Sequence, residues 1–326
     1  MLIYLTKRIV GLIPLLLGIT LLSFFIIHLA PGKPSDISGD LNPKVSLETR
    51  QRIEKLYDLD KPLMVQYSRW LNRLLRFDFG QSFSDGRPVS EKFFETIPIT
   101  LCINILSMFF IFIFGIPLGI VCALKKDSFF DKFSSFIVFF FIAAPTFWVA
   151  LLLMDLFGVK TGWFPVSGLK SLDFEYFGNF EKVLDLSRHL MLPLFVSSLS
   201  GFAVITRYMR QGMLQVLDQK YILGARARGI PDQIILYKHG LRNALLPIIT
   251  ILGLSIPGLI GGSVIFESIF SIPGTGRLFF IAVMGRDYPV IMAMLVLSAL
   301  LTLGGNLLAD IGYALADPRI KYKSKK

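Results

Sequence analysis

Apolar residues gather in six blocks along the chain, each roughly as long as the hydrocarbon core of a bilayer requires of a helix. The blocks lie at about 9–30, 99–124, 133–158, 190–206, 244–266 and 290–313. Polar segments of very different lengths separate them. The pattern therefore predicts an all-α membrane protein with six transmembrane helices.

The first block follows Lys7 and Arg8, as the apolar core of a signal peptide also would. That core usually spans about 7–15 residues and precedes a cleavage site of small residues. This block is longer and continues into Pro31. We therefore expect an uncleaved transmembrane helix.

Residues 31–98 are polar, with helical periodicity from Glu48 to Phe77 that Pro62 divides into two pieces. Several predicted spans contain proline, including Pro145 and Pro193, which membrane helices tolerate. The pairs Gly115 and Gly119, and Gly258 and Gly262, have the spacing at which helix backbones approach closely. Each pair is a candidate packing seam.

The net charge of +11 is distributed unevenly between the two sides of the predicted membrane domain. Segments 1–8, 125–132, 207–243 and 316–326 hold 17 Lys and Arg against five acids, whereas the opposite side is nearly balanced. Cytoplasmic loops carry the excess of basic residues. Both termini are therefore expected in the cytoplasm, and this accounts for the charge without nucleic acid.

This orientation divides the chain into four parts. Residues 1–30 form an N-terminal tail and first transmembrane helix, and 31–98 form an extracytoplasmic segment of helix and loop. Residues 99–315 form a core of five transmembrane helices with a long cytoplasmic loop at 207–243. Residues 316–326 form a basic cytoplasmic tail.

Candidate enzyme chemistry is missing from the sequence. The three histidines have no metal-ligand spacing, and Gly32-Lys33 is followed by Pro34, so no phosphate-binding loop is formed. Cys102 and Cys122 would lie about 30 Å apart on one helix and cannot pair. We expect a non-enzymatic chain without metal or cofactor, so that any ATP-powered step belongs to another chain.

The loop at 207–243 contains the most informative segment. Small residues surround two arginines in the run Gly224, Ala225, Arg226, Ala227 and Arg228. Gly229 is expected to end a short helix, Pro231 to prevent its continuation, and Asp232 to cap the next helix. One interpretation is a docking helix across the cytoplasmic membrane face. The alternative is an ordinary basic loop held at lipid headgroups.

Residues 221–247 resemble the cytoplasmic signature loop of ABC-transporter permeases, in the form found in the dipeptide, oligopeptide and nickel importer subgroup. Further matches to the first subunit of that permease pair follow in order along about 300 residues. They include Ala30-Pro-Gly, Asp78–Ser82, Arg87-Pro-Val89, Ala144–Phe147, Phe266–Phe270, Pro273–Arg277, Arg286–Val290 and Asp317-Pro-Arg319.

The resemblance implies the type I ABC importer permease (MetI-like) fold and import of dipeptides or oligopeptides by alternating access. It also implies four kinds of partner: a second permease, two ATPases that bind ATP and Mg²⁺, an extracytoplasmic binding protein, and membrane lipid. The alternatives are import of nickel or another small solute and, from another class, a secondary transporter that works alone.

One departure from the family pattern affects the docking role. The general consensus begins with Glu where Leu223 stands here, so docking must rest on shape and on other polar residues. The resemblance assigns this role to the small-residue run 224–229 and to His239, Arg242, Asn243 and Pro247.

The remaining candidates are ionisable or polar residues near the ends of spans. Asp155, Asn306 and Asp310 are candidates for the translocation path, because ionisable groups in membrane spans are costly and often functional. Glu267 and Arg277 flank Pro273–Gly276. They could order that loop or contact the binding protein.

Overall fold

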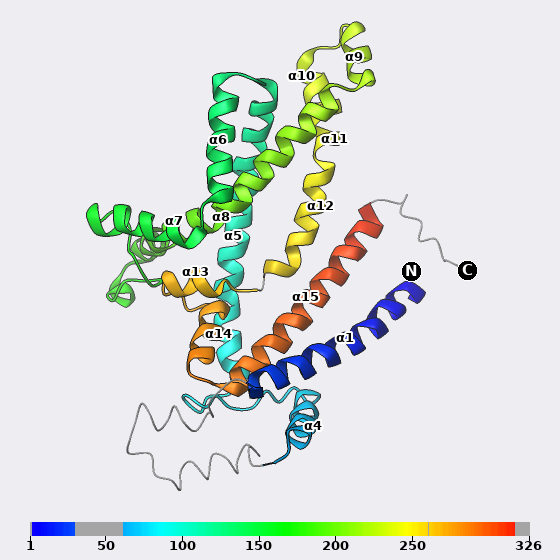
Figure 1. Cartoon of the computed structure of the whole chain (residues 1–326). Helices are drawn as coiled ribbons and strands as arrows, with labels where there is room; N and C mark the ends of the chain where they lie inside the picture. The colour runs from blue at the N-terminus through cyan, green and yellow to red at the C-terminus, as the bar shows by residue number, and fades with distance from the viewer. Residues whose placement is uncertain (1, 30–60, 260, 317–326) are drawn as a thin grey trace. The chain divides into compact units, whose positions relative to one another are not determined.

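A computed structural model describes residues 2–29, 61–259 and 261–316 (Figure 1). The predicted Ala30-Pro-Gly turn, the first piece of the Glu48–Phe77 helix and the tail 317–326 lie outside these ranges. Within them, the secondary structure is helical apart from an isolated antiparallel bridge between Gln81 and Pro88. The described residues form two compact units, one of residues 2–29, 61–99, 261–264 and 273–308, the other of the remaining described residues.

The first unit contains five helical segments. They are α1 (Leu2–Leu29), α4 (Leu63–Leu74), the beginning of α5 (Val89–Leu124), α14 (Thr275–Met284) and α15 (Tyr288–Ala316). Pro62 stands at the N-cap of α4, as the division of the predicted helix at this proline requires.

An aromatic core joins α4 to α1 in the first unit. Phe24 of α1 is 3% exposed and meets Tyr67 of α4 edge to face, with ring centroids 5.4 Å apart. The Tyr67 hydroxyl also lies 3.0 Å from Oγ1 of Thr20. The half-buried Tyr67 ring and its satisfied hydroxyl fix both the contact and the orientation of the amphipathic helix α4.

A loop before α5 is held by a buried carboxylate at the start of α15. Asp287 is 2% exposed, and it accepts hydrogen bonds from Oγ of Ser82 at 2.5 Å and from the Phe83 amide at 3.0 Å. The segments Asp78–Ser82 and Arg286–Val290, which both match the permease family in sequence, therefore meet in the first unit.

The same loop carries an ion pair. Lys92 donates to Oδ2 of Asp85 at 2.9 Å, and the Arg87 amide donates to Oδ1 at 3.2 Å. Desolvation raises the pKa of Asp85, but these hydrogen bonds outweigh it and hold the pKa below its ordinary value of 3.8.

The second unit is built around the long helix α8 (Asn179–Leu217) (Figure 1). Helices α6 (Phe129–Ala143), α7 (Thr146–Leu153), α11 (Arg242–Ala244) and α12 (Leu246–Ser255) pack against it. The other short elements are η1 (Met154–Lys160), η2 (Phe174–Tyr176), α9 (Lys220–Ala227), α10 (Asp232–Ile234), η3 (Ile235–Leu241), η4 (Ile256–Leu259) and α13 (Val264–Ile269).

Glycines allow α5 and α8 to pack closely in this unit. A methyl group added at Gly119 would stand 2.7 Å from Cβ of Met209 and 2.7 Å from the Thr206 carbonyl oxygen. One added at Gly115 would stand 3.1 Å from Ile205. The Gly115–Gly119 seam is therefore confirmed. A methyl group added at Gly258 would meet nothing within 4 Å, so the described part of the chain shows no packing seam at Gly258.

Four of the described helices are long and apolar enough to cross a membrane, in the segments Val10–Leu29, Val89–Leu124, Asn179–Leu217 and Tyr288–Leu307. They correspond to the first, second, fourth and sixth predicted spans. Two of them extend well beyond the prediction, because α5 and α8 continue as helices through polar residues at their ends.

The third predicted span is not one straight helix. The segments Phe129–Ala143 and Thr146–Lys160 meet at an angle of 105°. Ala144, directly before Pro145, is extended with φ −71° and ψ 130°, the conformation that a following proline favours. The expectation that a continuous helix tolerates Pro145 is wrong, whereas Pro193 does lie inside the continuous helix α8.

The fifth predicted span also differs from the structure. Helical conformation runs from α10 through η3, α11 and α12 and ends with η4 at Leu259, and Gly261 and Gly262 are not helical. The predicted continuation of the span to residue 266 is therefore wrong. The next helix, α13, begins at Val264.

Candidate functional site

The short helix α9 has one buried face and one exposed face. Ile222 is fully buried and Ala225 is 4% exposed, and both pack with Ile235 of η3 and Ile230. Leu223, Arg226 and Ala227 are exposed. This small apolar core fixes α9 to the segment that follows it and leaves the opposite face free.

The C-terminal end of α9 is a Schellman motif. Gly229 has φ +74°, and its amide donates to the Arg226 carbonyl at 2.9 Å. The next amide, of Ile230, donates to the Ala225 carbonyl at 3.2 Å. These two bonds and the left-handed residue satisfy the last carbonyls of a helix. The prediction that Gly229 ends the helix is confirmed.

The two arginines of α9 and its C-cap form contacts within the same segment. Nε of Arg226 lies 3.2 Å from Oδ1 of Asp232, across the turn after the helix. Nε of Arg228 donates to the Gly224 carbonyl at 3.1 Å. Asp232 is the first residue of α10, with Pro231 at the N-cap. The prediction of Asp232 as a capping residue is therefore wrong, because its carboxylate binds Arg226 instead.

A side-chain hydrogen bond ties the start of α9 to the beginning of the next long helical stretch. Nδ2 of Asn243 donates to the Tyr221 hydroxyl at 2.8 Å and to the His239 carbonyl at 3.1 Å. His239 is half-buried, whereas Arg242 and Pro247 are exposed. The structure thus brings both halves of the signature segment together as one surface.

The element between these halves, η3, is a π-helix of seven residues. Such wide turns are rare and occur frequently at functional sites. In Figure 1, α9 and α10 lie at one end of the second unit, beyond the ends of α8 and α11. The surface is therefore an exposed end of this unit.

The candidates for a translocation path are placed individually. Asp155 is exposed on η1 and forms an exposed ion pair with Lys160 at 2.6 Å. Asn306 is exposed on α15. Asp310 belongs to the same helix, but its side chain lies outside what the structure describes.

The two candidates near the 273–276 turn differ in exposure. Glu267 is 3% exposed and accepts a hydrogen bond from Oγ1 of Thr100 at 3.1 Å. Of the two roles left open for Glu267, ordering its loop is the one that this burial favours. Arg277 is half-buried in the first turns of α14.

An ion pair between α6 and α8 is a feature that the sequence did not predict. Nε and Nη2 of Arg210 donate to the two oxygens of Asp131 at 2.6 and 2.7 Å. Asp131 is only 2% exposed. No local motif predicts this pair, because its two residues are 79 positions apart in the sequence.

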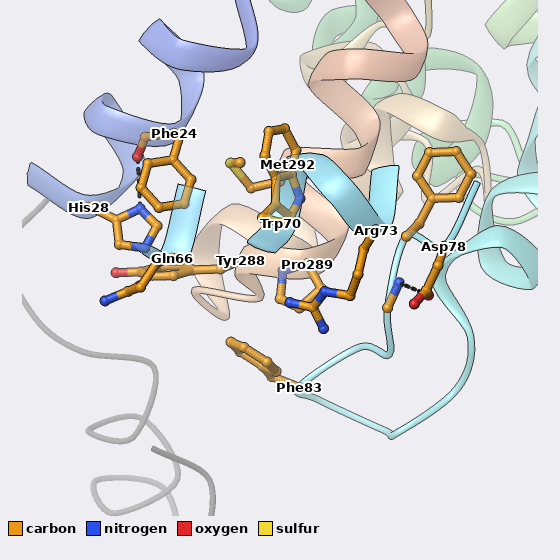
Figure 2. Close-up of a pocket in the computed structure, with 12 residues that line it drawn as sticks. Phe24, His28, Gln66, Trp70, Arg73, Asp78, Phe83, Tyr288, Pro289 and Met292 are labelled. Atoms are coloured by element: carbon orange, nitrogen blue, oxygen red, sulfur yellow. Dashed lines mark hydrogen bonds between the residues drawn. The ribbon is translucent and has the colours of Figure 1, made fainter. Parts of the chain in front are cut away.

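An aromatic cavity of about 60 Å³ lies in the first unit, near the start of α15 (Figure 2). The His28 ring stacks on Phe24 at 4.0 Å between centroids, and the other aromatic lining residues are Trp70, Phe79, Phe83 and Tyr288. The Gly80 amide donates to Oδ1 of Asp78 at 2.9 Å at the other end, as the dashed line in Figure 2 marks. Among the described residues, no group of three or more His, Cys, Asp or Glu could hold a metal ion.

Comparison with known proteins decides the family. The family described as "Binding-protein-dependent transport system inner membrane component" matches residues 115–322, and its N-terminal companion matches residues 1–104. The chain belongs to this family. It is a multi-pass membrane component of a binding-protein-dependent transport system, and the resemblance inferred from the sequence is confirmed.

The similarity to individual relatives extends over nearly the whole chain. The oligopeptide transport system permease protein AppB of Bacillus subtilis is 45% identical over 98% of this chain and 99% of its own length. The dipeptide permease DppB of Alkalihalophilus pseudofirmus is 36% identical over 99% of this chain and 100% of its own length. The glutathione permease GsiC of Salmonella paratyphi A is 35% identical over the same shares.

Proposed function

We propose that this chain is a permease subunit of an ABC importer that moves dipeptides or oligopeptides into the cytoplasm. The observation that carries the proposal is the 45% identity, over 98% of the chain, to a permease named for oligopeptide transport. Relatives named for dipeptide and glutathione transport extend the similarity to other short peptides.

The membrane orientation follows from charge. Six spans with both termini in the cytoplasm would put the basic segments on the cytoplasmic side and residues 31–98 outside. The fifth span would begin after the cytoplasmic segment that contains α10, η3 and α11, and would comprise α12 and η4, Leu246–Leu259. The bent pair of α6 and α7–η1 would supply the third, in a MetI-like permease fold.

Coupling to ATP hydrolysis is assigned to the surface of α9 and the following helical segment. Its exposed face offers small side chains and cations rather than an acid, because Leu223 replaces the glutamate of the general pattern. The Schellman turn ends α9 with a defined geometry, and the Asn243–Tyr221 bond connects α9 to α11. A push on α9 would therefore be transmitted to α11 and α12.

The partners are a second permease, two ATPase subunits that bind ATP and Mg²⁺, and an extracytoplasmic binding protein. Asp155, Asn306 and Asp310 remain candidates for the path between the two permeases, and Arg277 for contact with the binding protein. Transport would proceed by alternating access, in which the spans rock between inward-open and outward-open states.

Uptake of a labelled tripeptide by cells with and without the gene tests the proposal. Selective loss of peptide uptake, restored by the intact gene, is expected. Nickel uptake measured in parallel tests the nearest alternative. Loss of nickel uptake alone would mean that the chain is an ABC importer permease whose solute is nickel. Loss of neither would contradict the assigned substrate class.

A further inference from the structure

A cavity of about 290 Å³ lies in the second unit between α6 and α8, beside the last turns of α5. The residues that line it include Ser134, Phe139, Thr206, Arg207 and Arg210. Its lining is mainly apolar, and two arginine side chains at its wall distinguish it from the apolar packing elsewhere in the unit.

One of the two cations is already neutralised. Arg210 binds both oxygens of Asp131, which also accepts a hydrogen bond from the Asp127 amide at 3.0 Å. A bidentate pair of this kind fixes the geometry of the guanidinium and cancels its charge. The negative charge of Asp131 is therefore neutralised by Arg210. It repels an anion bound in the cavity less than an unpaired carboxylate would.

The other cation, Arg207, is exposed and has no carboxylate within ion-pair distance among the described residues. Its guanidinium stands over the ring of Phe139, 5.2 Å from the centroid. Stacking orients the planar group and leaves its N–H donors available. An arginine at the edge of a membrane span is costly unless an anion or water satisfies it.

The hydroxyl of Thr206 supplies an independent sign of a missing partner. The residue is 2% exposed and lines the cavity, yet its Oγ1 has no hydrogen-bond partner within the described part of the chain. Buried hydroxyl groups are almost always hydrogen-bonded. Because this oxygen is buried even from the cavity, it would donate to an anion beside Arg207 only after the Thr206 side chain turns toward the cavity.

We propose that this cavity binds the phosphate of an anionic phospholipid from the cytoplasmic leaflet. The inference rests on the membrane orientation proposed above, which places Arg207 directly after the fourth span, at headgroup depth. Phe136 and Phe140, on the same face of α6 as Phe139, are exposed and would lie against the acyl chains. Basic cavities between membrane helices at the cytoplasmic face bind acidic headgroups in this way.

Native mass spectrometry of the delipidated permease complex tests the proposal. The complex is titrated with phosphatidylglycerol, with phosphatidylcholine of the same acyl chains, and with inorganic phosphate. Arg207→Gln should weaken phosphatidylglycerol binding roughly ten- to a hundredfold, the range of one hydrogen bond to a charged group. Lys126→Gln removes an exposed cation outside the cavity and should leave binding unchanged.

Thr206→Val adds a readout that a merely structural role would not produce. Since the hydroxyl is unpaired without ligand, the variant should keep or raise the Tm of the lipid-free complex while it binds phosphatidylglycerol less tightly. A variant that lowers both would overturn the assigned role of this hydroxyl.

Three other results would overturn the proposal. Arg207→Gln could bind phosphatidylglycerol as the unmodified complex does, or Lys126→Gln could weaken it equally, which would mean diffuse surface attraction. Inorganic phosphate could bind with the same affinity and the same dependence on Arg207, which would make the ligand a free phosphate. None of these measurements uses peptide uptake, so failure here is distinguishable from failure of the proposed transport function.

Discussion

Replacement of Gly229 by alanine should loosen the end of α9. The left-handed conformation costs an L residue other than glycine about 1–2 kcal/mol, and Gly229 holds φ +74°. An added methyl group would meet no atom within 4 Å. The strain of the backbone is therefore the whole cost, with no steric clash to confuse its interpretation.

The chain offers two matched controls. Gly224 lies inside α9 and also faces open space, so the same substitution there should stabilise the helix by up to about 1 kcal/mol. Gly229→Asn changes the side chain but keeps a residue that tolerates the left-handed region. The backbone geometry therefore predicts that alanine at position 229 destabilises the C-terminal end of α9. Asparagine at position 229 should destabilise it little, and alanine at position 224 should not destabilise it.

Amide hydrogen exchange measures the effect directly. The amides of Gly229 and Ile230 form the two bonds of the Schellman motif. A loss of 1–2 kcal/mol in local opening free energy should speed their exchange roughly five- to thirtyfold in Gly229→Ala. Equal exchange in Gly229→Ala and the unmodified chain, or equal acceleration by asparagine, would refute the claim that left-handed geometry holds this turn.

Further outcomes follow from the packing and the charges. Gly119→Ala places a methyl group 2.7 Å from atoms of α8 and should lower stability by about 1–3 kcal/mol, seen as a lower Tm, whereas an unchanged Tm would contradict the close approach. Asp131→Asn should cost about 2–4 kcal/mol because it leaves Arg210 unpaired, and combining it with Arg210→Gln should recover part of that loss in the same unfolding assay. Lys92→Met removes a hydrogen bond that lowers the pKa of Asp85, so the carboxylate should titrate at higher pH by infrared spectroscopy. In the unmodified chain, the stability that Asp85 contributes is present above its unfolded-state pKa and is lost as the pH falls through its lower folded-state pKa.

On the coupling surface, the features that could be predicted are those set by residues adjacent in the sequence. Gly229 and Pro231 stand two residues apart, and each restricts its own backbone, so the end of α9 could be inferred from spacing alone. The partner of Asp232 could not be inferred in this way. Its position fits a cap, but Arg226 competes for the same carboxylate across the turn.

Membrane spans were predictable where a long apolar block coincides with uninterrupted backbone hydrogen bonding. Pro193 and Pro145 show why composition alone does not decide this. Both interrupt apolar blocks, yet α8 continues through Pro193, whereas the chain turns by 105° at Pro145. The difference lies in tertiary packing around each proline, which hydropathy does not record.

The long-range polar contacts could not be predicted from one sequence. Asp287 and Ser82 are 205 residues apart, and Arg210 and Asp131 are 79 apart. No periodicity or motif links residues at such separations. These pairs are nevertheless what anchor the loop before α5 and define the wall of the cavity between α6 and α8.

Photo-crosslinking from α9 tests the central claim most directly. A photoactivatable residue is placed at Leu223 or Ala227, both exposed on α9, and at the exposed Leu172 in the loop before α8 as a control. The complex is then irradiated and examined for adducts with the ATPase. Adducts from Leu223 and Ala227, and none from Leu172, are expected if α9 is the docking helix. Adducts from Leu172 with none from α9 would contradict both the docking surface and the membrane orientation.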